Sequence, residues 1–154
     1  MRDGDMKNGH RTGWLAVGLV WALAGASLAH SGVQNAAVKA RMALMGEIKE
    51  ATGVIGGMVK GEIAFDPAKA AVARAALVRH ASEITPAFEA QETDPKSEAR
   101  PEVWSDWAGF AARAEAMATA AEALDTGSPE ALADGLGALG QSCGGCHKLY
   151  RIEK

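Results

Sequence analysis

The sequence is poor in aromatic residues, has only two cysteines and carries no large excess of either charge. Aromatic side chains make up 5% of its 154 residues. Hydrophobic residues reach 48%, but 33 of them are alanine. Alanine favours helix and packs closely, yet it buries little surface, and strand-forming residues are scarce outside short clusters. The composition therefore predicts an all-α protein whose core is short of large side chains, so that another group is expected to fill its centre.

The charge balance excludes one class of partner. Lys and Arg number 16 against 19 Asp and Glu, a formal net charge of −3, and no basic block interrupts the chain. A nucleic-acid-binding protein usually carries a basic patch or stripe, so no nucleic-acid partner is expected. The length suits one domain, and we find no internal repeat or low-complexity tract.

The first 29 residues are typical of a secretory signal peptide. Arg2, Lys7 and Arg11 precede an apolar run over residues 13–29, which ends in a small-x-Ala cleavage sequence. The run is shorter than the roughly 20 residues that a membrane-spanning helix needs, so cleavage after Ala29 is favoured over an uncleaved anchor. We expect residues 30–154 to form one domain in the periplasm, without a later membrane span. Whether translation starts at Met1 or Met6 stays open.

Four helices are predicted after the signal peptide, because apolar residues recur at steps of three and four. Their expected extents are residues 35–59, 66 to just before Pro86, 101–125 and 129–150. Asp66-Pro67 and Ser128-Pro129 each combine a capping side chain with proline at the first helical position. Short connections make the first and last pairs antiparallel. The prediction is an antiparallel up-down-up-down four-helix bundle.

The two cysteines form the motif Cys143-Gly144-Gly145-Cys146-His147. Cys-x-x-Cys-His is the attachment pattern of c-type haem. Each thiol can add to a haem vinyl group, and the histidine can bind the iron. On a helix, residues 143, 146 and 147 lie on one side, so a single wall would carry both attachments and the ligand.

Three other interpretations of the motif are less favoured. A dithiol redox site prefers the start of a helix after a strand, where the helix dipole lowers the thiol pKa, whereas this motif lies late in a helix. A zinc site lacks a second ligand pair, because His30 and His80 are isolated in the sequence and His80 is expected to be exposed. A disulfide between the two cysteines would close a very short loop.

Several further segments carry a family resemblance. They are Val38-Lys39-Ala40-Arg41 with Met45 four residues on, Val59-Lys60-Gly61-Glu62, Phe65-Asp66, Arg100-Pro101-Glu102-Val103-Trp104 and the run from Cys143 to Arg151. With them, the chain from Val38 to Arg151 resembles cytochrome c′, the class II c-type cytochromes, including their methionine-ligated low-spin relatives. The resemblance implies one covalently attached haem c per chain, held by Cys143 and Cys146, with His147 as the proximal iron ligand. It also implies a non-enzymatic protein that transfers single electrons to and from redox partner proteins.

The resemblance assigns roles to four more residues. Arg41 would approach a haem propionate, Trp104 would pack near the haem edge, and Arg151 would lie beside the proximal imidazole. Met45 would lie over the distal face, where some members use this methionine as a ligand and others leave the iron open. Methionine ligation suits an electron carrier, whereas an open apolar face suits nitric oxide or carbon monoxide. The residues do not decide between these states. Homodimers formed through the first two helices occur in the family.

Overall fold

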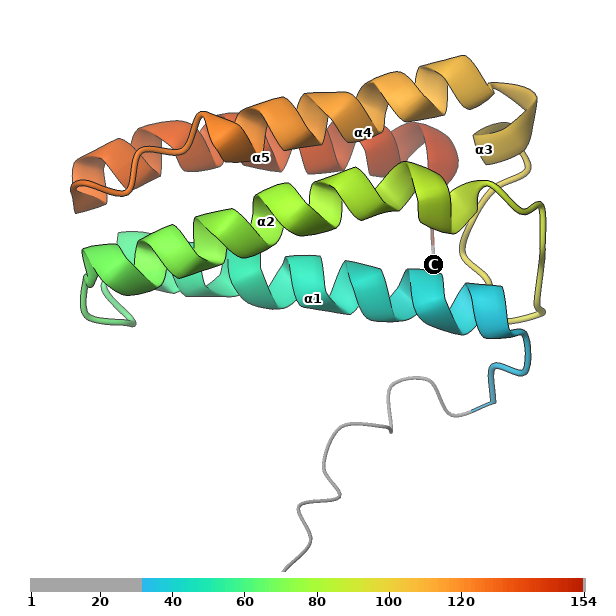
Figure 1. The fold of residues 1–154 in the computed structure, drawn as a ribbon, viewed down its shortest axis with the longest axis horizontal. Coiled ribbons are helices and arrows are strands. Elements are labelled where there is room, and N and C mark those ends of the chain that lie inside the picture. Colours follow the sequence, from blue (N-terminus) through green and yellow to red (C-terminus); the bar gives the residue numbers. More distant parts are fainter. Residues whose placement is uncertain (1–31, 154) are drawn as a thin grey trace, which may run out of the picture.

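Four long helices and one short helix build the part of the chain that the computed structural model describes, residues 32–153 (Figure 1). They are α1 (Ala36–Val59), α2 (Pro67–Phe88), α3 (Glu102–Ser105), α4 (Trp107–Glu122) and α5 (Pro129–Tyr150). Contacts join α1 to α2, α2 to α4, α4 to α5 and α5 back to α1. The up-down-up-down bundle is therefore confirmed. The predicted signal peptide lies outside the described residues. Within residues 32–153, no helix has both the length and the apolar character that a membrane crossing requires.

Polar side chains cap the starts of the long helices. Asn35 accepts a hydrogen bond from the backbone N–H of Val38. Asp66 and Ser128 cap α2 and α5 in the same way, and a proline follows each of them. These caps satisfy N–H groups that have no partner inside a helix. The expected starts near residues 35, 66 and 129 are therefore confirmed.

Two helix boundaries differ from the sequence prediction. Helix α2 continues through Pro86 to Phe88, because a proline in the last turn removes only one helical hydrogen bond before the helix ends. The predicted third helix is interrupted at Asp106, whose φ of −122° and ψ of 52° are not helical. The Asp106 carboxylate accepts from the N–H of Gly109 and so starts α4 anew.

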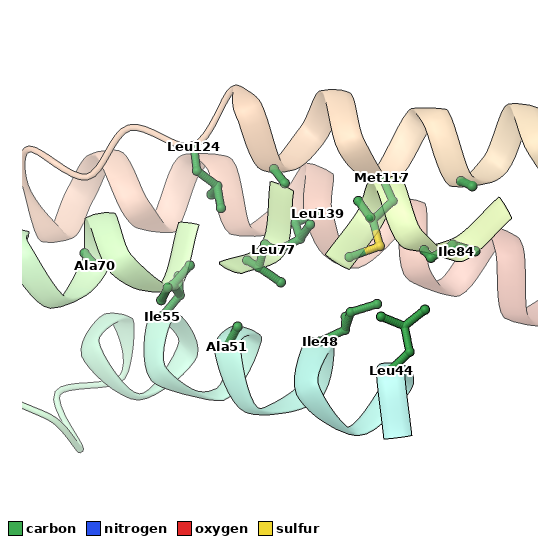
Figure 2. Close-up of a cluster of buried hydrophobic side chains, with 14 of the residues drawn as sticks. Leu44, Ile48, Ala51, Ile55, Ala70, Leu77, Ile84, Met117, Leu124 and Leu139 are labelled. Carbon is green, nitrogen blue, oxygen red and sulfur yellow. The ribbon is translucent and has the colours of Figure 1, made fainter. Parts of the chain in front are cut away.

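The core runs along the centre of the bundle and draws on all four long helices. Figure 2 shows Ile55 of α1, Leu77 of α2 and Leu139 of α5 meeting there. Each of these three side chains is completely buried. Alanines such as Ala51 and Ala70 occupy other core positions, as the composition predicts.

The polar loop before α3 is tied to the start of α1 and to the end of α5. The buried Asp94 carboxylate accepts from the backbone N–H groups of Gln34, Asn35 and Lys96. These hydrogen bonds lower the pKa of Asp94 below its ordinary value. On the other side, the loop pairs with the chain after α5, since the N–H of Ile152 donates to the carbonyl of Glu98 at 2.8 Å. The loop thereby holds the end of α5 in place.

Candidate cofactor site

A cavity of about 940 Å³ opens between the helices and extends along α1 from Val38 to Gly57, facing the second half of α5. Helix α5 contributes Cys143, Cys146 and His147 to its wall, and α1 contributes Arg41 and Met45. Small-molecule and cofactor sites usually measure roughly 300–1,000 Å³, so this cavity has room for a large cofactor. It brings together six of the seven residues that the sequence analysis singled out, because Arg151 also lines it.

Glycines of α1 leave part of this space open. Gly46, Gly53 and Gly56 line the cavity, and a Cβ atom added to any of them would meet no other atom within 4 Å. The absence of side chains at these positions widens the gap that faces α5. The shortage of large side chains seen in the composition therefore affects the cavity wall formed by α1.

The cysteine motif lies in the last two turns of α5, which ends at Tyr150. Both thiols are free and half-buried, and both face the cavity. Burial, together with the nearby Cys143, raises the pKa of Cys146, against a smaller opposite effect of Arg113. A thiol that stays protonated at neutral pH does not suit dithiol redox chemistry, which depends on a lowered thiol pKa.

His147 is available as a ligand at neutral pH. It keeps more than a third of its surface exposed. Desolvation by its surroundings and the positive charge of Arg151 nevertheless lower its pKa, and Glu98 opposes them. A neutral imidazole has a lone pair to offer a metal ion, whereas an imidazolium has none.

Arg151 follows α5 directly and is fixed by an ion pair. Its Nε donates to Oε2 of Glu98 at 2.8 Å, and its own backbone N–H donates to the carbonyl of His147. The guanidinium therefore lies close enough to His147 for its charge to lower the pKa of the imidazole.

Arg41 is a buried arginine whose guanidinium group donates hydrogen bonds to backbone carbonyls. Only 3% of its surface is exposed. Its Nε donates to Ala87 at 2.9 Å, Nη1 donates to Glu92 at 2.8 Å, and Nη2 donates to Ala90. Desolvation lowers its pKa, but an arginine keeps its charge in proteins. Arg41 thus places a positive charge at the cavity wall and also ties α1 to the end of α2 and the loop that follows.

Trp104 lies behind Arg41 and is not among the residues that line the cavity. Its Nε1 donates to the carbonyl of Phe88 at 2.8 Å. The guanidinium carbon of Arg41 lies 5.3 Å from the centre of the Trp104 ring and 5.0 Å from that of Phe88, within the range of a cation–π contact. Trp104 therefore acts on the cavity through the position of Arg41.

The sequence analysis missed two residues of the cavity wall as site residues. Tyr150 is buried and donates to Oδ2 of Asp106 at 2.6 Å, and this hydrogen bond raises the pKa of Tyr150 to about 12. Gly109 permits this approach, because a Cβ there would lie 2.6 Å from the Tyr150 hydroxyl. Arg113 of α4 also lines the cavity. It lies three residues after Phe110 and four before Met117, on the apolar stripe of α4. A charged residue at such a position could have been recognised in the sequence as a candidate site residue.

The structure corrects the expectation for His80. Only 7% of this residue is exposed, because α2 turns the imidazole toward α1 rather than to solvent. Its Nδ1 lies 3.3 Å from the Glu47 carboxylate and 3.1 Å from that of Glu83. His80 is therefore neither exposed nor isolated.

The residues around the cavity fit a c-type haem. Two thiols and a neutral imidazole share one wall, and positive charges suited to its carboxylates lie at Arg41 and Arg113. The remaining wall is largely apolar, with Met42, Ile48 and Val103 among its residues. Two carboxylates, Glu62 and Glu98, also line the cavity, and Glu98 is paired with Arg151.

Comparisons with known proteins agree with this fit. The family model for cytochrome c′ matches residues 36–151. A cytochrome c-556 of Agrobacterium tumefaciens strain apple 185 is 37% identical over 122 residues, which cover 75% of this chain and 94% of the relative.

Solved structures of cytochromes c′ are also similar. Cytochrome c′ from Rhodopseudomonas palustris matches with a TM-score of 0.72 and 29% identity, covering 79% of this chain and 99% of that one. A nitric oxide complex of a variant cytochrome c′ from Alcaligenes xylosoxidans matches with a TM-score of 0.68 and 30% identity, covering 76% and 94%.

Proposed function

Because the chain belongs to the cytochrome c′ family, whose members bind haem c covalently and serve in electron transfer or gas binding, we propose that it is a periplasmic single-electron carrier. Cys143 and Cys146 would hold the haem, and His147 would bind its iron. The observation that carries the proposal is the cavity itself, since one space collects both thiols, the imidazole and the Met45 thioether. The bound haem supplies a reversible one-electron change at iron.

The protein's own groups prepare the cavity for that role. The lowered pKa of His147 favours the neutral imidazole, which has one ring nitrogen without a proton, and Arg151 holds a positive charge beside it. A positive charge near a redox centre favours the reduced form, because that form carries one positive charge fewer. Arg41 and Arg113 provide cations for carboxylates at the wall.

Met45 determines how the distal side works in this proposal. It is partly buried, packs against the core and faces the same cavity as His147 from the neighbouring helix. If its thioether bound the iron of the haem, it would raise the reduction potential and leave no open position for a gas. We assign Met45 this role, which suits a protein that exchanges electrons with redox partner proteins.

A second candidate function is the binding of nitric oxide or carbon monoxide. It is favoured by the apolar character of the α1 wall, where Met42, Met45 and Ile48 lie. The hydroxyl of Thr52 already donates its hydrogen to the carbonyl of Ile48, so it has no hydrogen left to donate to a ligand. The similar Alcaligenes xylosoxidans structure is a nitric oxide complex.

The visible spectrum of Met45→Ala separates the two candidates. If Met45 is a ligand, wild-type protein is low-spin and does not bind nitric oxide readily, and the variant becomes high-spin. Met42→Ala is the matched control, because Met42 lines the same cavity and the change removes the same atoms. A wild-type protein that is already high-spin and shifts on addition of nitric oxide would contradict the electron-carrier proposal and support gas binding.

The proposed location has its own test. Signal-peptide cleavage after Ala29 predicts that the protein recovered from a periplasmic extract begins at His30, as N-terminal sequencing would show. Protein that begins at Met1 or Met6 and stays with the membrane fraction would contradict it.

A further inference from the structure

A second group of ligand atoms lies between α1 and α2, outside the cavity. Its members are Glu47 of α1 with His80 and Glu83 of α2. One nitrogen and two carboxylate oxygens lie within 4.8 Å of one another. These residues are not among those that line the cofactor cavity. We propose that they form a binding site for a divalent cation, with zinc the best match.

The spacing of the three atoms fits the ion. Zinc binds nitrogen and oxygen ligands at about 2.0–2.2 Å, so two ligands of a tetrahedral site lie about 3.3 Å apart. Nδ1 of His80 lies 3.3 Å from Oε2 of Glu47 and 3.1 Å from Oε2 of Glu83. Three protein ligands with a water molecule would complete a four-coordinate site. One imidazole with two carboxylates suits a borderline cation better than the oxygen-only sites of calcium.

The two helices hold the ligands with different freedom. The His80 side chain is only 9% exposed, whereas those of Glu47 and Glu83 are 55% and 49% exposed. His80 and Glu83 are three residues apart on α2 and share one face. The fixed imidazole thus sets the position of the ion, and the exposed carboxylates can close around it. Bound in this way, the cation would join α1 to α2.

Arg79 opposes cation binding at His80, and this gives the proposal a further test. Its Nη2 lies 2.9 Å from Nε2 of His80. Since arginine can only donate, Nε2 accepts, and the ring proton lies on Nδ1 between the carboxylates. An ion on Nδ1 requires that proton to move to Nε2, where it would face the arginine donor. Arg79 is exposed and can turn away, but it favours the metal-free tautomer.

The test is calorimetric titration of the haem-loaded protein with Zn²⁺. We expect one Zn²⁺ per chain, with the affinity lowered at least about tenfold in Glu47→Gln and in Glu83→Gln. Glu50→Gln is the matched control, since it removes an exposed carboxylate of α1 that lies outside the group; it should bind as wild type. Arg79→Gln should bind more tightly, because glutamine can accept from Nε2.

Four results would overturn the proposal. They are the absence of saturable binding up to about 1 mM Zn²⁺, unchanged affinity in both carboxylate variants, an equal loss in Glu50→Gln, and weaker binding in Arg79→Gln. The substituted glutamates are exposed, and circular dichroism of each variant checks that the fold is kept. A rise in Tm with Zn²⁺ should accompany binding in wild type and be much smaller in Glu47→Gln.

Discussion

Preventing haem attachment should unfold the packed interior of the bundle. The change is the double variant Cys143→Ser and Cys146→Ser, purified without haem. Large-to-small core substitutions cost about 24 cal/mol per Å³ of residual cavity. Applied to about 940 Å³, this gives roughly 20 kcal/mol, an upper bound because water can enter so large a space. Typical proteins have only about 5–15 kcal/mol of stability, so the haem-free chain should lose its tertiary packing.

Circular dichroism and urea unfolding would measure this effect. We expect helical far-ultraviolet signal to persist in part, the near-ultraviolet signal to be lost and cooperativity to be weak, as in a molten globule. Haem-loaded Leu77→Ala is the control, because it removes a fully buried side chain and should lose about 2–5 kcal/mol while unfolding cooperatively. A cooperative, native-like transition in the haem-free double variant would refute the reasoning.

Three further predictions concern residues around the site. Arg41→Lys should lower the free energy of unfolding by about 2–4 kcal/mol, because lysine replaces at most one of three charge-assisted hydrogen bonds; a loss below about 1 kcal/mol in urea unfolding would contradict this. Asp94→Asn should destabilise the protein most at neutral pH. Because folding lowers the pKa of Asp94, the difference in the free energy of unfolding between wild type and variant should shrink as pH falls below about 4. A difference that does not depend on pH would contradict this. Asp134→Asn is the control. Trp104→Phe should cost about 1 kcal/mol by thermal unfolding, through loss of the indole hydrogen bond, and no change would argue against it.

The architecture could be read from local patterns in the sequence. Periodic apolar residues and the caps at Asp66 and Ser128 define helices through interactions within a few residues of the chain, so a single sequence reveals them. The break at Asp106 was not predicted, although the cap that Asp106 forms with the N–H of Gly109 is local. The second partner of this carboxylate, the hydroxyl of Tyr150, lies 44 residues further along the chain and cannot be inferred from local sequence.

The cofactor site was predictable to a similar extent. The motif at Cys143, Cys146 and His147 is contiguous and specific, whereas the cavity in front of it depends on how α1 and α5 pack. Arg41 shows the limit most clearly. A charged residue on an apolar stripe indicates a special environment, but its carbonyl partners at Ala87, Ala90 and Glu92 belong to a distant segment.

His80 was misjudged for the same reason. Charged neighbours in the sequence suggest an exposed residue, but exposure depends on which face of α2 meets α1. Glu47, the residue that makes the group at His80 chemically distinctive, comes from the other helix.

The central claim is that one haem is covalently attached through Cys143 and Cys146, and intact-protein mass spectrometry after acid-acetone extraction tests it most directly. The claim predicts that the extracted protein keeps a mass greater than that of the chain by one haem, and that the double serine variant loses this increment. Recovery of the wild-type chain at its bare mass, with the haem in the solvent, would contradict it.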